Sequence, residues 1–349
     1  MTTDVFAPRP GYRDLMVYRV EAGPVDFDLG DNTNLFGSAP SARQAVIEWA
    51  AGDPAKYPTP GIGDLRAALG EWQGVEPDQV LGGCGSNDVL DSAMRALVEP
   101  GSKVAFAAPT FVMTAHFAAA NSLVPVPVPT LADGTPDIDG LLATGAPIIY
   151  LATPNNPSGV VSDPAALDRL LDRAPYLVFL DEAYVEFAGS SRAREAVARG
   201  NVLVTRTFSK AWGLAGLRLG YGIGSAKLIR EIEKARGPFK VNALAERAAT
   251  AAVRRDQEWL AATIATVRTE RESFAEGLRR IGFEPLSSAA NFLGVPVSDA
   301  PKAADLLARR GVAVRAFTAS PVFGDLLRIT VGPPEAQRRV IDGLAELSR

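Results

Sequence analysis

Short apolar runs alternate with helical patterns between about residue 42 and residue 236. The runs have the length of strands buried on both faces, and they lie at residues 104–108, 147–152, 177–180 and 201–205. Helical stretches separate them, such as residues 88–98 and 164–173, and the second begins with a proline preceded by Asp163, which favours a helix start. This alternation predicts an α/β fold with a mostly parallel central sheet flanked by helices.

The pattern changes after Gly237-Pro238. Residues 243–280 are rich in Ala, Arg and Glu and predict long helices. Fewer strand runs follow, at residues 292–297, 312–315 and 326–331. Further helices are predicted near residues 301–310 and from residue 334, so this part is expected to form an α+β unit.

We therefore expect two domains and an arm. The large domain is predicted at residues 41–237 and a smaller α+β domain at residues 238–349. Residues 1–40 are rich in Pro, Gly, Asp and Asn. They are expected to form an irregular arm that joins the small domain and a partner subunit.

Composition narrows the class of protein. The 349 residues are 47% hydrophobic and carry a net charge of −4 without a basic block, which argues against nucleic acid as a partner. No apolar run approaches 18 residues and the N-terminus lacks a signal pattern, so neither a membrane nor secretion is expected. The single cysteine, Cys84, excludes an internal disulfide and indicates the cytoplasm. The single histidine, His116, excludes most histidine metal sites, and we expect it to be packed in a helix.

Lys210 is the strongest candidate for chemistry. It is one of seven lysines, follows a β-branched run and lies among small residues, where a long side chain would not serve packing. Loss of hydration and a nearby positive charge lower the pKa of such a lysine and make it a nucleophile toward carbonyl groups. Arg218, eight residues on, is a candidate for that charge and for a phosphate clamp.

Most of the other candidate segments follow predicted strands, where open α/β sheets bind ligands. Residues 82–88 open a helix with glycines, which is typical of an anion cradle, although a plain strand-to-helix turn has the same pattern. Phe111 could stack on a flat cofactor or belong to the core. Asn156 lies in a segment of turn residues, and Asp181 ends an apolar strand, where a buried carboxylate needs a cation or a metal.

Together these groups match what pyridoxal 5′-phosphate requires. The cofactor needs a lysine for a Schiff base, a phosphate cradle, and an acid beside the pyridine nitrogen so that its ring accepts electrons. A metal-dependent alternative would need ligand clusters that the sequence lacks, so no metal is expected.

From about Leu29 to the C-terminus the chain resembles the fold-type I pyridoxal-phosphate aminotransferases, and among them the histidinol-phosphate aminotransferase branch. The motifs that carry this resemblance are Asn-Asn-Pro-Ser-Gly at 155–159, Asp-Glu-Ala-Tyr at 181–184, and Thr-Phe-Ser-Lys through Gly-Leu-Arg-Leu-Gly at 207–220. Their order and spacing are specific to this family.

The resemblance implies roles for individual residues. Lys210 would form the Schiff base, Asp181 would pair with the ring nitrogen, and Phe111 would stack on the ring. Asn156 and Tyr184 would bind the ring oxygen, and Tyr184 would also count among the catalytic residues. The phosphate would be held by Ser86, Asn87, Thr207, Ser209 and Arg218. Tyr57 would reach the cofactor phosphate of the neighbouring subunit, which makes a homodimer the expected functional unit.

The substrate side is implied by two arginines. Arg328 matches the arginine that binds a substrate carboxylate or phosphate, and Arg315 matches a second one seen in the histidinol-phosphate branch. Two guanidinium groups suit a dianionic phosphate, although a solvated arginine at the end of a strand remains an alternative for Arg315. Asn34 is a further substrate-binding candidate.

The chain departs from the branch at three places. Residues 32–35 read Asn-Thr-Asn-Leu where Asn-Glu-Asn-Pro is usual. Phe111 replaces a tyrosine, and Asn87 replaces an aspartate that is common there. The first departure falls in a segment that helps to line the substrate pocket.

The resemblance implies a ping-pong transamination in which the Lys210 amine moves the proton. The reaction would convert L-histidinol phosphate and 2-oxoglutarate to imidazole-acetol phosphate and L-glutamate, in histidine biosynthesis. The alternatives are an aminotransferase for aromatic or other amino acids, and a decarboxylase or oxidase on the same scaffold. A non-catalytic regulatory protein is a further alternative, but the arm of about 40 residues is short for a DNA-binding module.

Overall fold

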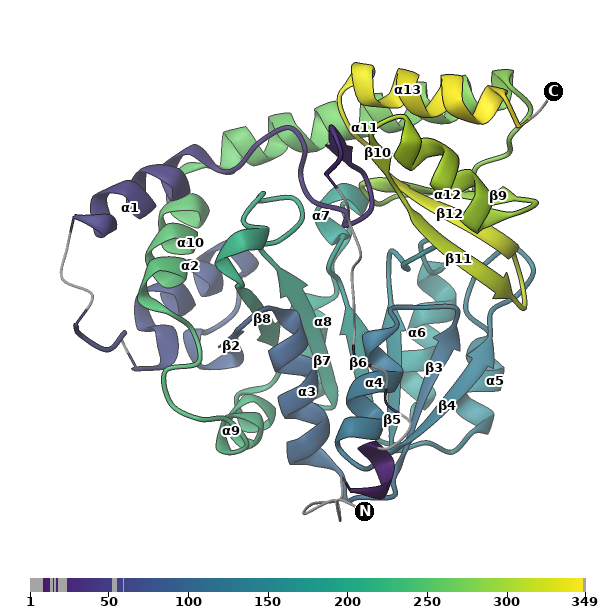
Figure 1. Ribbon diagram of the computed structural model, residues 1–349. Helices are drawn as coiled ribbons and strands as arrows, with labels where there is room; N and C mark the ends of the chain where they lie inside the picture. Colours follow the sequence, from purple (N-terminus) through teal and green to yellow (C-terminus); the bar gives the residue numbers. More distant parts are fainter. Residues whose placement is uncertain are drawn as a thin grey trace, which may run out of the picture.

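A seven-stranded sheet forms the centre of the large part of the molecule (Figure 1). The computed structural model describes residues 9–12, 15, 17, 24–51, 55–58 and 60–347. The strand order is β2-β8-β7-β6-β5-β3-β4; β8 pairs antiparallel with both β2 and β7, and the other adjacent strands pair in parallel. The strands are β2 (Val80–Gly83), β3 (Lys103–Ala108), β4 (Val124–Pro129), β5 (Ile148–Ala152), β6 (Leu177–Asp181), β7 (Val202–Thr207) and β8 (Gly220–Ile223). The predicted, mostly parallel central sheet is confirmed.

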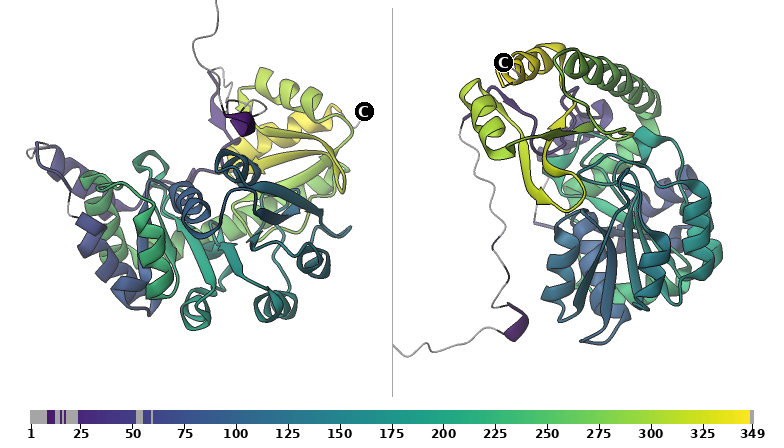
Figure 2. Two further views of the ribbon diagram at one scale, coloured as in Figure 1. Left: turned by 90° about the horizontal axis from the view of Figure 1, so that it is seen from below. Right: turned by 90° about the vertical axis from the view of Figure 1, so that its right-hand side faces the viewer.

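The apolar runs are strands because helices cover both faces of this sheet (Figure 2), which buries the residues of β5, β6 and β7. Along β6, Val178 and Leu180 enter one hydrophobic core, whereas Leu177 and Phe179 enter a second core on the opposite face. The alternation places Asp181 on the face of Phe179 and Glu182 on the other face.

Helices cover both faces. The second core includes residues of α3 (Ser86–Leu97), α4 (Met113–Ala120), which contains His116, and α9 (Ala226–Lys234). The first core includes residues of α1 (Pro40–Ala50), α2 (Gly63–Gln73), α5 (Ile138–Ala143), α6 (Pro164–Arg173), α7 (Val185–Ala188), α8 (Ala193–Arg199), α10 (Ala243–Arg255) and α11 (Gln257–Arg280). Short 3₁₀ helices are η1 (Pro10–Tyr12), η2 (Pro60–Ile62), η3 (Pro77–Gln79) and η4 (Ala215–Leu217).

A smaller sheet lies at one end of the molecule, at the upper right in Figure 1. It contains β9 (Phe292–Val297), β11 (Arg315–Ser320) and β12 (Gly324–Thr330) in the antiparallel order β11-β12-β9. With α12 (Ala300–Arg309) and α13 (Pro334–Ala345) it encloses a third core. The predicted domain boundary at residue 238 stays a prediction. Helix α10 follows this boundary in the sequence, yet it packs against α1 and α2 of the large part.

The end of the N-terminal arm joins this smaller part. Strand β1 (Phe27–Asp28) pairs in parallel with β10 (Val312–Ala313), and the Leu29 amide continues the pairing with a 2.8 Å hydrogen bond to the Ala313 carbonyl. The arm residues that follow are thereby directed toward the junction of the two sheets.

Three strands of the large sheet were not predicted. β2 and β8 contain two glycines each, and glycine weakens the signal for a strand. β4 reads Val-Pro-Val-Pro-Val-Pro and occupies the edge of the sheet, where missing N–H groups are tolerated. The predicted long helical region is divided at Asp256, which accepts hydrogen bonds from Ser41 at the start of α1.

Within the described ranges, we find no helix with the length and apolar character needed to cross a lipid bilayer.

Candidate active site

A cavity of about 300 Å³ opens where β5, β6 and β7 end. Its walls also include the start of α3, arm residues 31–33, and Arg328 of β12. The predicted site residues that line it are Ser86, Asn87, Phe111, Asn156, Asp181, Tyr184, Thr207, Ser209, Lys210, Arg218 and Arg328. Residues far apart in the sequence thus converge at the carboxyl edge of the sheet, as open α/β folds favour.

Lys210 has an amine whose pKa is lowered toward neutrality. Burial, which removes water from the ammonium, lowers the pKa of Lys210 to about 7, and the charge of Arg328 contributes next. Arg218, the charge that the sequence suggested, contributes less than Arg328, while Asp31 and Asp181 oppose the change. The Lys210 Nζ donates a 2.8 Å hydrogen bond to the backbone carbonyl of Asp31.

Asp181 lies at the end of β6, where its carboxylate is fixed by three donors. They are the Tyr150 hydroxyl at 2.8 Å, the Ala183 amide at 3.1 Å and the Thr205 hydroxyl at 3.2 Å. Burial raises the pKa of Asp181, although these hydrogen bonds and the charge of Lys210 oppose that rise. A cation placed beside this buried carboxylate would be strongly stabilised.

The arm and the small sheet close the other side of the cavity. Asn32 Nδ2 donates to the Tyr184 hydroxyl at 3.0 Å. Arg328 Nη1 donates to Asn156 Oδ1 at 2.7 Å, and its Nη2 donates to the Gly30 carbonyl. The second asparagine of the same turn, Asn155, instead binds Pro109 and Thr110 and so fixes the loop.

The start of α3 forms an anion cradle with Arg218. Ser86 and Asn87 occupy the first helical positions, where backbone N–H groups have no partner within the helix. A Cβ atom on Gly220 would lie 2.2 Å from the Ser86 nitrogen, so only glycine allows β8 to approach this turn. Ser209 donates its amide to the Thr207 hydroxyl at 3.0 Å, which orders the facing loop.

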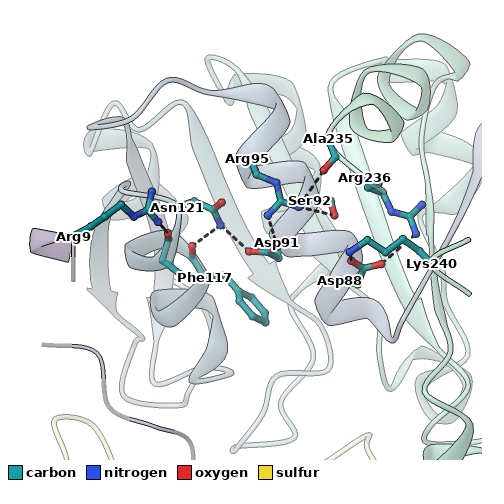
Figure 3. A network of polar contacts seen from close by, with 11 residues as sticks. Arg9, Asp88, Asp91, Ser92, Arg95, Phe117, Asn121, Ala235, Arg236 and Lys240 are labelled. Carbon is teal, nitrogen blue, oxygen red and sulfur yellow. Dashed lines mark hydrogen bonds and ion pairs between the residues drawn. The ribbon is translucent and has the colours of Figure 1, made fainter. Parts of the chain in front are cut away.

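Asp88, the next residue of α3, does not line the cavity but holds the turn before this cradle. Its carboxylate accepts the Cys84 amide at 3.1 Å and pairs with Arg236 and Lys240, each at 3.2 Å (Figure 3). Burial alone would raise the pKa of Asp88, but the charge of Arg236 and the further contacts lower it overall. The ionised carboxylate therefore holds the turn before Ser86 in place.

Three predicted site residues do not line the cavity. Arg315 of β11 lies opposite Arg328 of β12 and forms a 3.1 Å ion pair with Asp31. Tyr57 is 80% exposed and stacks on Phe239, with 4.6 Å between ring centroids. Asn34 donates to the Ala211 carbonyl at 2.9 Å and accepts the Phe36 amide, which are bonds that shape the arm.

Sequence reasoning missed Asp31, Asn32 and Tyr150. Tyr150 could be found from the sequence, because a tyrosine within a fully buried strand needs a hydrogen-bond partner for its hydroxyl. Asn32 belongs to the segment in which the chain departs from the family pattern, and the resemblance points to Asn34 as the substrate-binding candidate instead. No local signal distinguishes Asp31, because its position depends on pairing with residues near 313.

Comparisons with known proteins identify the family. The family model described as aminotransferase class I and II matches residues 24–344. The chain belongs to this family. Its relatives place it in the histidinol-phosphate aminotransferase branch. One, from Jannaschia sp. strain CCS1, is 38% identical over 97% of this chain and 98% of its own. Another, from Roseiflexus castenholzii, is 37% identical over 92% of this chain and 89% of its own.

Solved structures agree with this assignment. A histidinol-phosphate aminotransferase from Sinorhizobium meliloti, solved in complex with pyridoxal 5′-phosphate, has a TM-score of 0.88 at 28% identity. The similarity covers 99% of this chain and 98% of that one. The predicted fold-type I architecture is therefore confirmed. Enzymes of the family use amino donors and 2-oxo acids and are typically dimeric.

The cofactor of this aminotransferase is pyridoxal 5′-phosphate, and the cavity fits it. Lys210 offers an amine that is largely uncharged just above neutral pH, and Asp181 offers a buried carboxylate for a ring cation. Phe111 and Ala183 both line the cavity with apolar surface suited to a flat ring. The N–H groups at the start of α3, close to Gly220, fit a phosphate.

Proposed function

We propose that this aminotransferase acts on L-histidinol phosphate and 2-oxoglutarate and forms imidazole-acetol phosphate and L-glutamate, a reaction of histidine biosynthesis. Similarity over nearly the whole chain to relatives of that name carries the proposal. The pairing of Arg315 with Arg328 across β11 and β12 supports it further, since two adjacent guanidinium groups suit a dianionic phosphate.

For the cofactor we propose the roles that the family resemblance implies. Lys210 forms the covalent link, Asp181 pairs with the ring nitrogen, and Phe111 stacks on the ring. Asn156 and Tyr184 bind the ring oxygen. The phosphate is bound by Ser86, Asn87, Thr207, Ser209 and Arg218, which all line the cavity. Asn34 supports the substrate pocket indirectly through its hydrogen bond to Ala211.

The chain's own groups can then perform the proton transfer. When bound, pyridoxal 5′-phosphate withdraws electrons from the carbon that carries the amino group. The Lys210 amine, with a pKa of about 7, is suited to take the proton from that carbon and to return it later in the cycle. Arg328, fixed by Asn156 and Gly30, orients the anionic end of the substrate. Two such half-reactions give ping-pong kinetics.

We also propose a cytoplasmic homodimer in which Tyr57 reaches the phosphate of the partner's cofactor. Its 80% exposed ring is held by Phe239 rather than buried within its own chain, which supports a role outside it. Tyr57 also borders a hollow of about 370 Å³ with residues of α1 and α10. The single cysteine supports the cytoplasmic location.

A half-reaction screen tests the proposed substrate. Candidate amines are added one at a time to the holoenzyme, and the absorbance of the cofactor is followed. We expect L-histidinol phosphate and L-glutamate to convert the cofactor to its amine form, and phenylalanine to do so far more slowly. Faster conversion by phenylalanine would contradict the proposed substrate, and release of carbon dioxide or uptake of oxygen would contradict transamination.

A further inference from the structure

Asp31 brings a negative charge into a cavity that should attract anions. It lines the cavity, and its side chain is 45% exposed. Its Oδ1 atom lies 3.1 Å from Nη2 of Arg315, while its backbone carbonyl accepts the hydrogen bond from Lys210. The same residue therefore contacts the reactive amine and one of the two candidate anion-binding arginines.

The backbone fixes this placement. β1 pairs with β10 so that Asp28 lies beside Ala313, and the Asp28 carboxylate accepts the Gly30 amide at 2.8 Å in the turn that follows. A Cβ atom on Gly30 would lie 3.6 Å from the Val314 carbonyl carbon, so the arm lies close against the strand. Asp31 consequently reaches Arg315 through the register of the arm and not through a long, freely moving side chain.

The charge of Asp31 has a clear physical effect at this position. Arg315 and Arg328 are directly opposite on antiparallel strands, where two like charges repel each other. Arg328 donates hydrogen bonds to uncharged oxygens of Asn156 and Gly30, and Arg315 forms an ion pair with the Asp31 carboxylate. An anion that approaches the arginine pair must displace that carboxylate or remain close to it, and the cost grows with the charge of the anion.

We propose that Asp31 is a specificity residue that makes anions compete for Arg315 and thereby keeps small dianions from occupying the substrate site. This inference rests on the proposed function in assigning Arg315 and Arg328 to the substrate phosphate. A phosphate attached to the substrate meets the same repulsion, but contacts to the rest of the substrate compensate for it, and a free inorganic dianion lacks those contacts. Asp31 therefore lowers the occupancy of the site by the free ion while the substrate still binds.

The test measures binding of sulfate and of acetate to the holoenzyme by isothermal titration calorimetry, so that no turnover is needed. Repulsion between the Asp31 carboxylate and an anion roughly 6 Å away, in a medium as polar as water, weakens the affinity about threefold for each unit of charge on the anion. Asp31→Asn should thus bind acetate about threefold and sulfate about tenfold more tightly than the wild type. Asp31→Glu, which keeps the charge, should resemble the wild type.

Asp26→Asn is the matched control, because Asp26 belongs to the same arm and pairs with Arg339 outside the cavity. It should bind both anions as the wild type does. Unchanged or weaker sulfate binding by Asp31→Asn, or an equal gain for both anions, would overturn the proposal. If histidinol phosphate proves not to be a substrate, the proposed function fails by the half-reaction screen, and the sulfate and acetate affinities still decide the role of Asp31.

Discussion

Replacement of Lys210 by methionine should abolish catalysis and yet stabilise the cofactor-free protein at neutral pH. The wild-type chain holds an amine whose pKa falls to about 7 because folding removes its water. Below that pH the folded protein must accommodate a charge that the unfolded chain exposes freely. Methionine has a similar length and no charge, so Lys210→Met removes the free energy that the folded protein spends on burying this charge.

The size of the effect follows from the two pKa values. The difference between 10.5 and about 7 corresponds to roughly 4 to 5 kcal/mol, because one pKa unit is about 1.36 kcal/mol. Water in the open cavity lowers the free energy needed to bury the Lys210 charge. The variant also loses the hydrogen bond to the Asp31 carbonyl, which reduces its gain in stability by about 1 kcal/mol more. We therefore expect a net stabilisation of roughly 2 kcal/mol at pH 7.

The stabilisation by Lys210→Met should change with pH in a way that identifies its cause. Between about pH 7 and 10.5 the unfolded chain binds more protons than the folded one, so the stability of the wild type rises with pH. The advantage of Lys210→Met should be greatest at or below pH 7, about half as large at pH 9, and small above pH 10.

Urea denaturation of the two cofactor-free proteins, at equal concentration and at several pH values, measures this difference. Lys103→Met is the matched control, because Lys103 is an exposed residue at the start of β3. Its effect should be small and constant from pH 7 to 9. A Lys210→Met protein that is less stable than the wild type at pH 7, or a gain that does not fall with pH, would refute the reasoning.

Two further predictions concern the affinity for the cofactor, measured by fluorescence titration. Tyr150→Phe removes the 2.8 Å hydrogen bond that opposes the raised pKa of Asp181, and we expect about tenfold weaker cofactor binding; an unchanged affinity would contradict this role. Tyr57→Phe should weaken binding about tenfold by loss of one phosphate hydrogen bond from the partner, whereas Tyr176→Phe, at another exposed tyrosine, should change nothing. Equal affinities in all three proteins would contradict the role of Tyr57.

The sequence predicted the parts of the fold whose signal is local. Strands β3, β5, β6 and β7 are buried on both faces and therefore appear as apolar runs. The start of α6 was predictable because Asp163 caps it, accepting the Ala166 amide at 2.9 Å. β2, β4 and β8 were not predictable, since their glycines and prolines are tolerated only because neighbouring strands pair with them.

The same distinction applies to the candidate site. Lys210 and Asp181 end or follow apolar strands, so their position in the chain indicated their position in space. Asp31 and Asn32 lie in an arm without a local pattern, and their contacts depend on the pairing of β1 with β10, some 285 residues away in sequence (from Phe27 to Val312). Even for Lys210 the sequence named Arg218 as the neighbouring charge, because it could not place Arg328 of the small sheet nearby.

The pairing of β1 with β10 also determines when this enzyme can be completed during synthesis. A ribosome that has made the whole central sheet has not yet made Val312, the residue beside which Phe27 must lie. Until residues 312–313 emerge, residues 27–28 have no strand to pair with, and the Lys210 amine lacks its contact with Asp31. The catalytic centre of the nascent protein therefore stays unfinished until Val312 has been made and can pair with Phe27.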